Sequence, residues 1–265
     1  VYKRQIMQLG VSTSCYFPLE TEVSLAHLGA AGVRHAELFL NTLCETEPAF
    51  IQQLRAQCKE TDLDIVAFHP FTSGMEPLYF ASASTRRVAD GIKLYRKLFA
   101  CAESLGAQIF TMHGDVKTNP VDFSYYCENF ATLAEIATEY GLTLSQENVV
   151  RCKSGSIDNI RRMRELLGDK VHFTLDVKQA VRSGEDPFDM LDAMAGKICH
   201  VHLSDHTVQY DCLPPGKGDL DCAAFFRRLQ ATGFNRNIIV ELYRENFATD
   251  QDLADSLDYL KQYIE

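Results

Sequence analysis

Disulfide and zinc-thiolate spacings are missing from this 265-residue sequence, although it contains nine cysteines. Their odd number and scattered positions, with no Cys-x-x-Cys pair, indicate neither a disulfide framework nor a thiolate zinc site. Free cysteines favour a reducing compartment, so we expect a cytoplasmic protein. No apolar run approaches the ~18 residues of a membrane helix. The mixed, polar segment after Lys3 and Arg4 is unlike a signal peptide, and we expect no membrane association.

Basic residues are outnumbered by acidic ones, 26 against 36, which gives a formal net charge of −10. Nucleic acids are bound largely through basic surface, so this balance argues against a nucleic-acid partner. The sequence also lacks a Gly-x-Gly-x-x-Gly fingerprint, a P-loop and a Gly-x-Ser-x-Gly elbow. We therefore expect no nucleotide cofactor.

The sequence does contain a regular alternation of short apolar runs and longer amphipathic stretches. The runs predict eight strands, over 7–13, 33–39, 63–69, 107–113, 142–147, 171–176, 198–204 and 237–242. The stretches between and after them predict helices, over 20–31, 48–61, 85–105, 122–140, 156–167, 187–195, 222–232 and 250–264. Several of the helices are followed by a glycine suited to a left-handed helix terminus, namely Gly32, Gly106, Gly141, Gly168 and Gly233.

Alternating strands and helices predict an α/β protein with a parallel sheet. Eight units in a chain of this length favour a closed (β/α)8 TIM barrel, whose typical size is about 250 residues. An open, doubly wound sheet is the alternative, but the turn after the first strand lacks the glycines typical of that fold. We expect one domain over 1–265, with residues 1–6 as a non-native or disordered leader.

Ionisable residues stand at the ends of seven of the eight predicted strands. In a barrel these ends meet at one rim, where the active site lies. The residues are Glu37, His69, His113, Glu147, Asp176, the pair His200 and His202 with Asp205 beyond them, and Glu241. Converging carboxylates repel one another unless a cation offsets them. Oxygen and imidazole ligands without thiolate predict Mn, Mg, Co or Zn.

Several of these residues also carry a resemblance to a known family. The motifs are Glu147-Asn148, Leu175-Asp176, His200-Val201-His202-x-x-Asp205, Pro215-Gly216-Lys217-Gly218 and Val240-Glu241. In their order and spacing the sequence resembles the xylose isomerase-like superfamily, in its branch of sugar and sugar-phosphate isomerases and epimerases. Tagatose/psicose 3-epimerase and hydroxypyruvate isomerase are members of that branch.

The resemblance implies that Glu147, Asp176, His202 and Glu241 bind one divalent metal ion. It also implies that Glu147 and Glu241 act as the acid/base pair on opposite faces of the substrate, with a metal-stabilised enediolate between the two proton transfers. The expected substrate is a small sugar, sugar phosphate or keto-acid. We leave open whether the protein is a homodimer or homotetramer.

The sequence departs from the epimerase pattern after the sixth strand. An Asp-x-x-His run is common there, whereas this chain reads Asp176-Val177-Lys178-Gln179. Gln179 cannot titrate but can donate a hydrogen bond to substrate. Lys178 can contact substrate or pair with a neighbouring carboxylate. The substitution leaves the identity of the substrate open.

Two histidines have more than one interpretation. His69 and His113 can hydrogen-bond substrate, lie in the core, or bind a second metal with Glu147, as the resemblance to apurinic-site endonucleases of the superfamily implies. Those nucleases need further histidines that this chain lacks. An inosose dehydratase-like lyase on the same site is the main alternative to an isomerase, and a ligand-binding barrel without activity is another.

The remaining candidates lie on strand two and on two long loops. Glu37 is expected to point inward, to bind a substrate hydroxyl or hold a cation, and Asp205 to orient a ligand histidine or hold Lys217. If the substrate carries a phosphate, we expect it at Lys217, the flanking glycine amides and Arg244; the alternative is that this glycine-containing segment is only a rigid turn. The loop 70–84 is expected to cap the pocket or meet a partner subunit.

Overall fold

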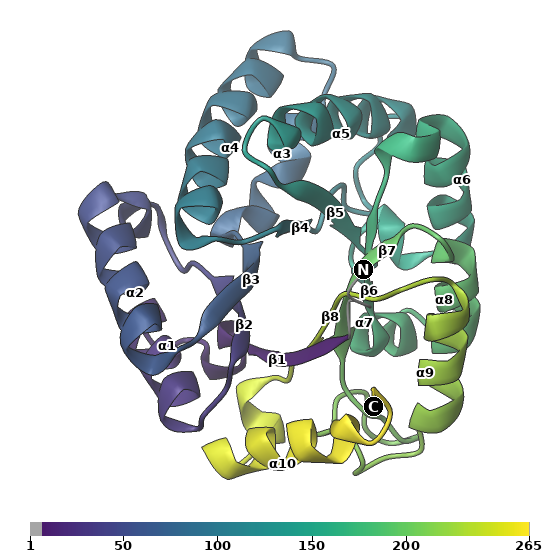
Figure 1. The fold of residues 1–265 in the computed structure, drawn as a ribbon. Coiled ribbons are helices and arrows are strands. Elements are labelled where there is room, and N and C mark those ends of the chain that lie inside the picture. The colour runs from purple at the N-terminus through teal and green to yellow at the C-terminus, as the bar shows by residue number, and fades with distance from the viewer. Residues whose placement is uncertain (1–6, 265) are drawn as a thin grey trace, which may run out of the picture.

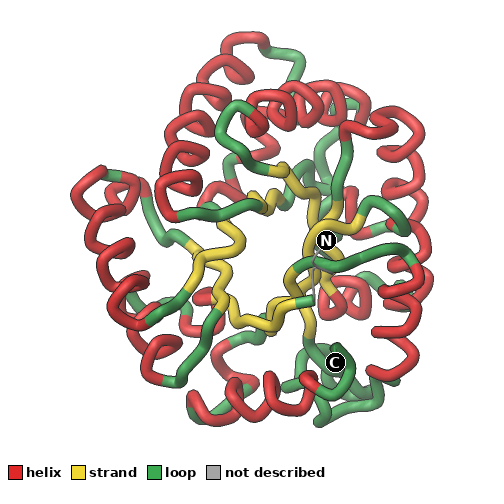
Figure 2. Tube along the Cα trace, in the orientation of Figure 1, coloured by secondary structure: helices red, strands yellow, loops and turns green. Residues whose placement is uncertain are grey.

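The computed structural model describes residues 7–264, which form a closed barrel of eight parallel strands surrounded by helices (Figures 1 and 2). Each strand pairs with its successor, and β8 pairs with β1, so the predicted (β/α)8 barrel is confirmed. The strands are β1 (Gln8–Ser12), β2 (His35–Phe39), β3 (Asp64–His69), β4 (Ile109–Met112), β5 (Thr143–Glu147), β6 (Phe173–Asp176), β7 (Ile198–Leu203) and β8 (Asn237–Val240). The leader predicted at residues 1–6 lies outside the described residues.

The helices form a ring outside the strands (Figure 2). They are α1 (Thr21–Ala30), α2 (Pro48–Thr61), α3 (Glu76–Phe80), α4 (Thr85–Leu105), α5 (Phe123–Thr138), α6 (Ile157–Leu167), α7 (Val177–Arg182), α8 (Pro187–Met194), α9 (Cys222–Ala231) and α10 (Asp250–Lys261). The short helices α3 and α7 were not predicted, because each lies in a segment too short to show a helical period. Within residues 7–264, no helix is long and apolar enough to cross a bilayer.

Helix ends follow the predicted glycine pattern with one difference. Gly106 ends α4 in the left-handed conformation, at φ 86° and ψ 8°. Gly168 after α6 also has a positive φ of 55°, but its ψ of −115° lies outside the left-handed helical region. There the chain continues into a short 3-10 turn, Gly168–Lys170, before β6. A glycine is still required at this position, because side chains with a Cβ avoid this region.

Apolar side chains fill the space between strands and helices, whereas the inside of the barrel combines a few apolar side chains, such as Ala67 and Ile109, with a set of buried polar ones. Phe68, Phe110 and Phe173 are buried in the outer core. The buried polar side chains inside the barrel are Ser12, Glu37, Thr111, Ser145, Thr174 and His200. They form one hydrogen-bonded network around the Glu37 carboxylate. Barrel interiors are usually filled with branched apolar residues. Here several interior side chains are polar instead, and they hold Glu37 in place beneath the mouth of the barrel.

The first strand passes so close to its neighbours that position 10 requires glycine. A Cβ on Gly10 would lie 2.2 Å from the carbonyl oxygen of His35 and 2.8 Å from Cδ1 of Ile239. The backbone of His35 cannot move away without disturbing the pairing of β1 with β2. Glycine therefore allows the barrel to close at this point.

We predict that Gly10→Ala lowers the free energy of unfolding by about 1–3 kcal/mol, the usual cost of overpacking. Chemical denaturation of the purified variant measures this change. Gly74→Ala is the matched control, because a Cβ there has no neighbour within 4 Å. Equal stability of the Gly10 variant and the wild type would contradict the close approach.

Candidate active site

Four of the predicted strand-end residues converge at the carboxyl end of the barrel. Ligand atoms of Glu147, Asp176, His202 and Glu241 all lie within 4.8 Å of one another. Nδ1 of His202 lies 3.3 Å from Oε1 of Glu147, 3.6 Å from Oδ2 of Asp176 and 3.3 Å from Oε2 of Glu241. Strands β5, β6, β7 and the end of β8 thus deliver three carboxylates around one imidazole nitrogen, as the sequence predicted.

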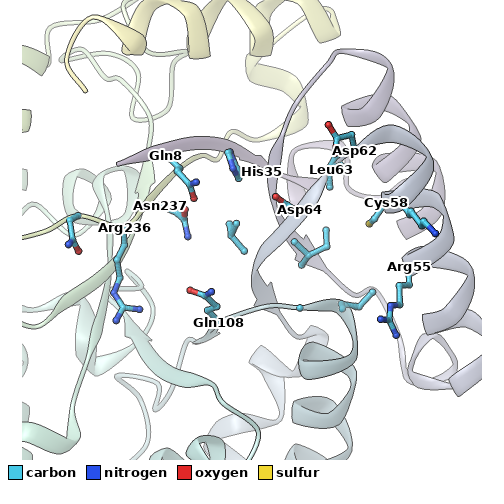
Figure 3. A pocket seen from close by; sticks show the side chains of 16 residues that line it. Gln8, His35, Arg55, Cys58, Asp62, Leu63, Asp64, Gln108, Arg236 and Asn237 are labelled. Atoms are coloured by element: carbon cyan, nitrogen blue, oxygen red, sulfur yellow. The ribbon is translucent and has the colours of Figure 1, made fainter. Parts of the chain in front are cut away.

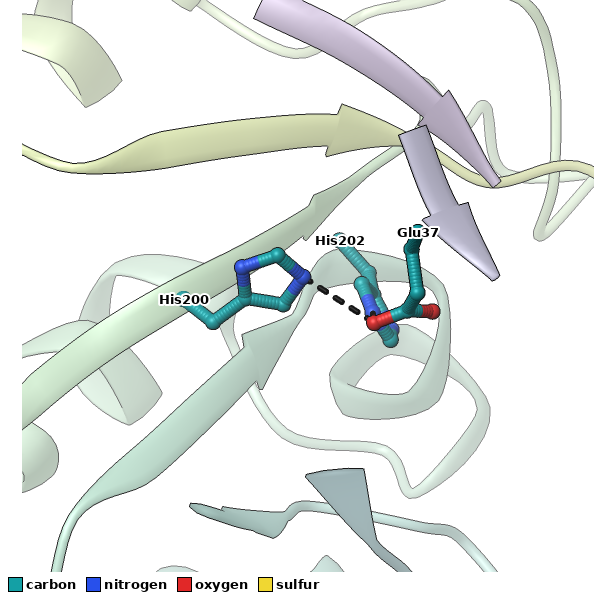
Figure 4. A group of neighbouring side chains, drawn as sticks. All are labelled: Glu37, His200 and His202. Carbon is teal, nitrogen blue, oxygen red and sulfur yellow. Dashed lines mark hydrogen bonds and ion pairs between the residues drawn. The ribbon is translucent and has the colours of Figure 1, made fainter. Parts of the chain in front are cut away.

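The second nitrogen of His202 is held from below by Glu37. Oε2 of Glu37 lies 3.0 Å from Nε2 of His202 and 3.0 Å from Nε2 of His200 (Figure 4). A carboxylate that accepts from Nε2 places the ring proton there, which leaves Nδ1 to face the three carboxylates. This is the arrangement in which a histidine binds a metal while a carboxylate orients it.

Charges in this cluster shift the pKa values of its members. Burial alone would raise the pKa of Glu37, but His202 and His200 outweigh it and hold that pKa well below the usual range. Burial lowers the pKa of His202, whereas Glu37 and Glu241 raise it well above its ordinary value. In the absence of another cation, a proton on His202 is therefore the ion that balances these carboxylates.

The cluster fits a divalent cation. Oε2 of Glu147 and Oδ2 of Asp176 are buried and accept no hydrogen bond, although His113 Nε2 and Lys178 Nζ each lie 3.0 Å away. Burial raises the pKa of Asp176, and the charges of Glu147 and Glu241 add to this effect. A divalent ion would satisfy the two oxygens and replace the proton on His202. The donor set of three carboxylates and one imidazole suits Mn, Mg, Co or Zn.

Lys178 is a buried cation beside two of the carboxylates. Its Nζ lies 3.0 Å from Oδ2 of Asp176 and 2.5 Å from Oε2 of Glu241. Burial would lower the pKa of Lys178, but Asp176 and Glu241 raise it well above the ordinary lysine value. Burial likewise raises the pKa of Glu241, yet Lys178 and His202 bring it down to about 2. Ser14 Oγ donates to the other oxygen of Glu241 at 2.9 Å.

A cavity of about 350 Å³ opens above the cluster. It is lined by Ser14, Phe17, Phe39, His69, Ser73, His113, Glu147, Val149, Arg151, Lys178, Gln179, Glu241, Leu242 and Tyr243. Glu147 and Glu241 belong to this lining, whereas Asp176 and His202 do not. The two residues predicted as bases therefore face the cavity, and the other two candidate ligands lie beneath it.

A larger cavity of about 700 Å³ lies at the opposite end of the barrel (Figure 3). Its lining includes residues where strands begin, such as Gln8, His35, Asp64 and Asn237. Among the described residues, none of the groups of three or more converging metal-ligating side chains includes a residue of this lining. Catalytic residues of TIM barrels lie at the other end, so the smaller cavity is the candidate active site.

His69, His113 and Glu147 also come together, but their hydrogen bonds do not fit the predicted second metal. Nη2 of Arg151 lies 3.0 Å from Nδ1 of His113. A guanidinium only donates, so neutral His113 carries its proton on Nε2, which faces Nε2 of His69 at 2.8 Å and Oε2 of Glu147 at 3.0 Å. A metal at this Nε2 would force a proton onto Nδ1, against the guanidinium. Arg151, His113 and His69 form a hydrogen-bonded chain instead, and the Glu147 carboxylate lies at ion-pair distance from it.

The structure does not favour the predicted phosphate site. The carboxylate of Asp205 accepts hydrogen bonds from the backbone amides of His206, Gly216, Gly218 and Leu220. The glycine amides expected to bind phosphate are thus already used, and Asp205 neither orients a histidine nor holds Lys217. Lys217 is exposed and does not line the cavity. Arg244 stacks on the Phe247 ring at 4.8 Å and donates to the Phe247 carbonyl, also outside the cavity.

The structure refines three further expectations. Glu37 is fully buried beneath His202, so it positions that histidine and does not contact substrate. Gln179 reaches the cavity, but its Oε1 accepts the amide of Val150, so only its NH₂ group is free to donate. The segment 70–84 is largely folded, and of its residues Ser73 lines the cavity while Phe80 is buried in the core.

Some residues around the cavity were not found from the sequence. Ser14, Arg151 and Tyr243 line the cavity from the loops after β1, β5 and β8. Arg151 follows Glu147 by four positions, and Tyr243 follows Glu241 by two. The only sequence signal for these residues is that they lie a few positions after a strand-end ligand. Their residue types alone do not indicate that they line the cavity.

Comparisons with known proteins agree with this barrel. Residues 25–263 match the sequence model of a family described as xylose isomerase-like TIM barrel. An uncharacterized protein of Mycobacterium leprae is 23% identical over 98% of this chain and 99% of its own length. A 3-dehydroshikimate dehydratase of Pseudomonas aeruginosa is 22% identical over 91% of this chain, which corresponds to 39% of that protein. The crystal structure of D-psicose 3-epimerase from Clostridium cellulolyticum H10 superposes with a TM-score of 0.79 over 98% of this chain and 100% of its own, at 13% identity.

We predict that Glu37→Gln weakens Mn²⁺ binding by about 10- to 100-fold, because a glutamine no longer fixes the proton of His202 on Nε2. Titration calorimetry of the metal-free protein measures this affinity. His202→Ala is expected to abolish binding, and Glu76→Gln, at a buried glutamate that belongs to none of the groups of converging metal-ligating side chains found among the described residues, is the matched control. An unchanged affinity in Glu37→Gln would contradict the positioning role.

The loop 205–220 yields a separate prediction. Asp205→Ala leaves four backbone amides without their acceptor, so we expect a loss of at least about 2 kcal/mol in the free energy of unfolding. Lys217→Ala should change stability by less than about 0.5 kcal/mol, as for an ordinary surface residue. Thermal and urea unfolding of both variants provide the comparison. A large effect at Lys217 with none at Asp205 would refute this account of the loop.

Proposed function

Because this chain belongs to the xylose isomerase-like TIM barrel family, we propose that it is a divalent-metal-dependent isomerase or epimerase that moves a proton next to the carbonyl of a small polyhydroxylated substrate. The proposal rests above all on one observation. Of the four residues in the carboxylate–histidine cluster, the two that face the cavity are Glu147 and Glu241.

A metal in this cluster would be held by Glu147, Asp176, His202 and Glu241. When bound, it supplies a positive charge that stabilises the negative charge developing on the carbonyl oxygen of the substrate. Asp176 is suited to holding the metal without taking part in proton transfer. Its Oδ1 accepts a hydrogen bond from the Gln179 amide at the start of α7, while its Oδ2 faces the cluster. His202 is held from below by Glu37.

Proton transfer is assigned to the two glutamates. Glu147 comes from β5 and Glu241 from the end of β8, with β6 and β7 between them, so they approach the cavity from different sides. Their neighbours keep both carboxyl groups ionised, because the pKa of each lies below its usual value. One carboxylate removes the proton beside the carbonyl. The other takes up a proton from solvent and then donates it to the opposite face or to the adjacent carbon.

The side chains that line the cavity can orient the substrate and exclude water from it. Phe17, Phe39, Val149 and Leu242 supply apolar surface, which favours the ring or chain of a sugar and displaces water from the reacting carbon. The free NH₂ group of Gln179 is placed to hydrogen-bond a substrate oxygen. The ring nitrogens of His69 and His113 already face Pro70, Arg151, Glu147 and each other, so these two side chains shape the wall of the cavity. Lys178 adds a positive charge beside Glu241.

A dehydratase is the second candidate function, favoured by the similarity to 3-dehydroshikimate dehydratase. The same carboxylate would remove the proton beside the carbonyl. The intermediate would then lose water from the next carbon, with a protonated side chain such as Lys178 near the leaving hydroxyl. The product is a conjugated carbonyl compound with a new ultraviolet absorbance, which an isomerase does not produce.

We predict that Mn²⁺-loaded protein incorporates solvent deuterium into a ketose or keto-acid substrate, and that Glu147→Gln and Glu241→Gln abolish product formation. Each glutamate is the base for one face, so one of the two variants should still exchange the substrate proton without forming product. Mass spectrometry and NMR of a substrate panel measure both. Metal content is determined alongside, and Glu76→Gln is the control. Near wild-type turnover in either variant with metal retained would rule out the two-base mechanism.

A further inference from the structure

We propose that Arg151 recognises an anionic group of the substrate and that this group is a carboxylate, so that the natural substrate is a small hydroxylated keto-acid and not a neutral sugar. The inference rests on the proposed function only for what happens to the substrate after it binds. Its own basis is the charge and hydrogen bonding of the cavity.

Two cations line the cavity, and only one of them is neutralised by neighbouring carboxylates in the described part of the chain. Lys178 is in contact with both Asp176 and Glu241. Arg151 lines the same cavity, yet among residues 7–264 no carboxylate lies within 4.0 Å of its guanidinium. Its charge is therefore available to a ligand, in a chain whose net charge of −10 would otherwise repel an anion.

The guanidinium is also oriented. Its Nη2 donates to Nδ1 of His113 at 3.0 Å, and His113 is in turn held by Glu147. This bond uses one of five N–H donors of the arginine, and the remaining donors keep their fixed planar arrangement. A planar carboxylate matches two such donors side by side. His113 thus lies between Arg151 and Glu147, one of the two proposed bases. A carboxylate bound by Arg151 would therefore lie apart from the carbon from which Glu147 removes a proton.

This site is less suited to a phosphate than to a carboxylate. Phosphate groups in barrels are typically bound by loop amides near the last strands, and here the Gly216 and Gly218 amides donate to Asp205. The cavity of about 350 Å³ lies at the small end of the range for ligand sites. A hydroxylated acid of roughly six or seven carbons is in keeping with that size.

The test compares acids with matched neutral and phosphorylated compounds at equilibrium, without turnover. Calorimetry with Mn²⁺-loaded protein measures the affinity for 5-keto-D-gluconate and 3-dehydroshikimate as acids, for D-fructose and D-tagatose as neutral ketoses, and for D-fructose 6-phosphate. We expect at least one acid to bind about ten- to a hundredfold more tightly than the neutral ketoses, as a charge-assisted hydrogen bond allows.

Variants then assign this preference to the arginine. Arg151→Gln is expected to remove it, and Arg151→Lys to recover part of it, because lysine keeps the charge without the planar pair of donors. Arg161→Gln removes one exposed charge from α6, away from the cavity, and should change nothing.

The possible failures are distinguishable. If no acid binds more tightly than the neutral ketoses, or if Arg151→Gln keeps the preference, the inference is overturned, even when deuterium exchange shows the proposed chemistry on a neutral ketose. If the phosphorylated sugar binds most tightly and depends on Arg151, the carboxylate assignment is wrong. If acids bind through Arg151 but no compound exchanges its proton, the inference stands and the proposed function fails.

Discussion

The hydrogen bond from His202 to Glu37 determines how the rest of this site is arranged. Glu37 lies inside the barrel with no exposure to solvent, and its Oε2 receives Nε2 of both His202 and His200. With its proton fixed at Nε2, His202 presents Nδ1 to three carboxylates. Lys178 offsets part of the charge of Asp176 and Glu241. A divalent cation would offset the rest, because burying carboxylates together is otherwise costly. A glutamate buried beneath the cluster thus influences what the mouth of the barrel can bind.

The contrast between His202 and His113 shows how second hydrogen-bond partners separate two similar clusters. Both histidines direct one nitrogen at Glu147. The other nitrogen of His202 meets a carboxylate, whereas that of His113 meets the Arg151 guanidinium. The first partner leaves a lone pair for a metal, and the second leaves a proton in its place. One barrel mouth therefore combines a candidate metal centre with an adjoining hydrogen-bonded chain that ends in a cation at the cavity.

The sequence was sufficient to predict the barrel and the convergence of Glu147, Asp176, His202 and Glu241, because strand periodicity and strand order bring these positions to one rim. It was insufficient for residues whose role depends on loop conformation. Asp205 and Lys217 were expected to serve the site, but the loop folds so that its amides surround Asp205. The histidine partners of Glu37 and Arg151 lie more than thirty positions away in sequence, and side-chain pairing at that range has no periodic signal.

The central claim is that one divalent cation completes the cluster above Glu37. The most direct test is a crystal structure of protein loaded with Mn²⁺, with anomalous differences recorded at the manganese edge. The account predicts one peak per chain, at about 2.0–2.4 Å from Nδ1 of His202 and from oxygens of Glu147, Asp176 and Glu241, with Nε2 of His202 still on Glu37. A peak between His69 and His113, or no peak at the cluster when metal is saturating, would contradict it.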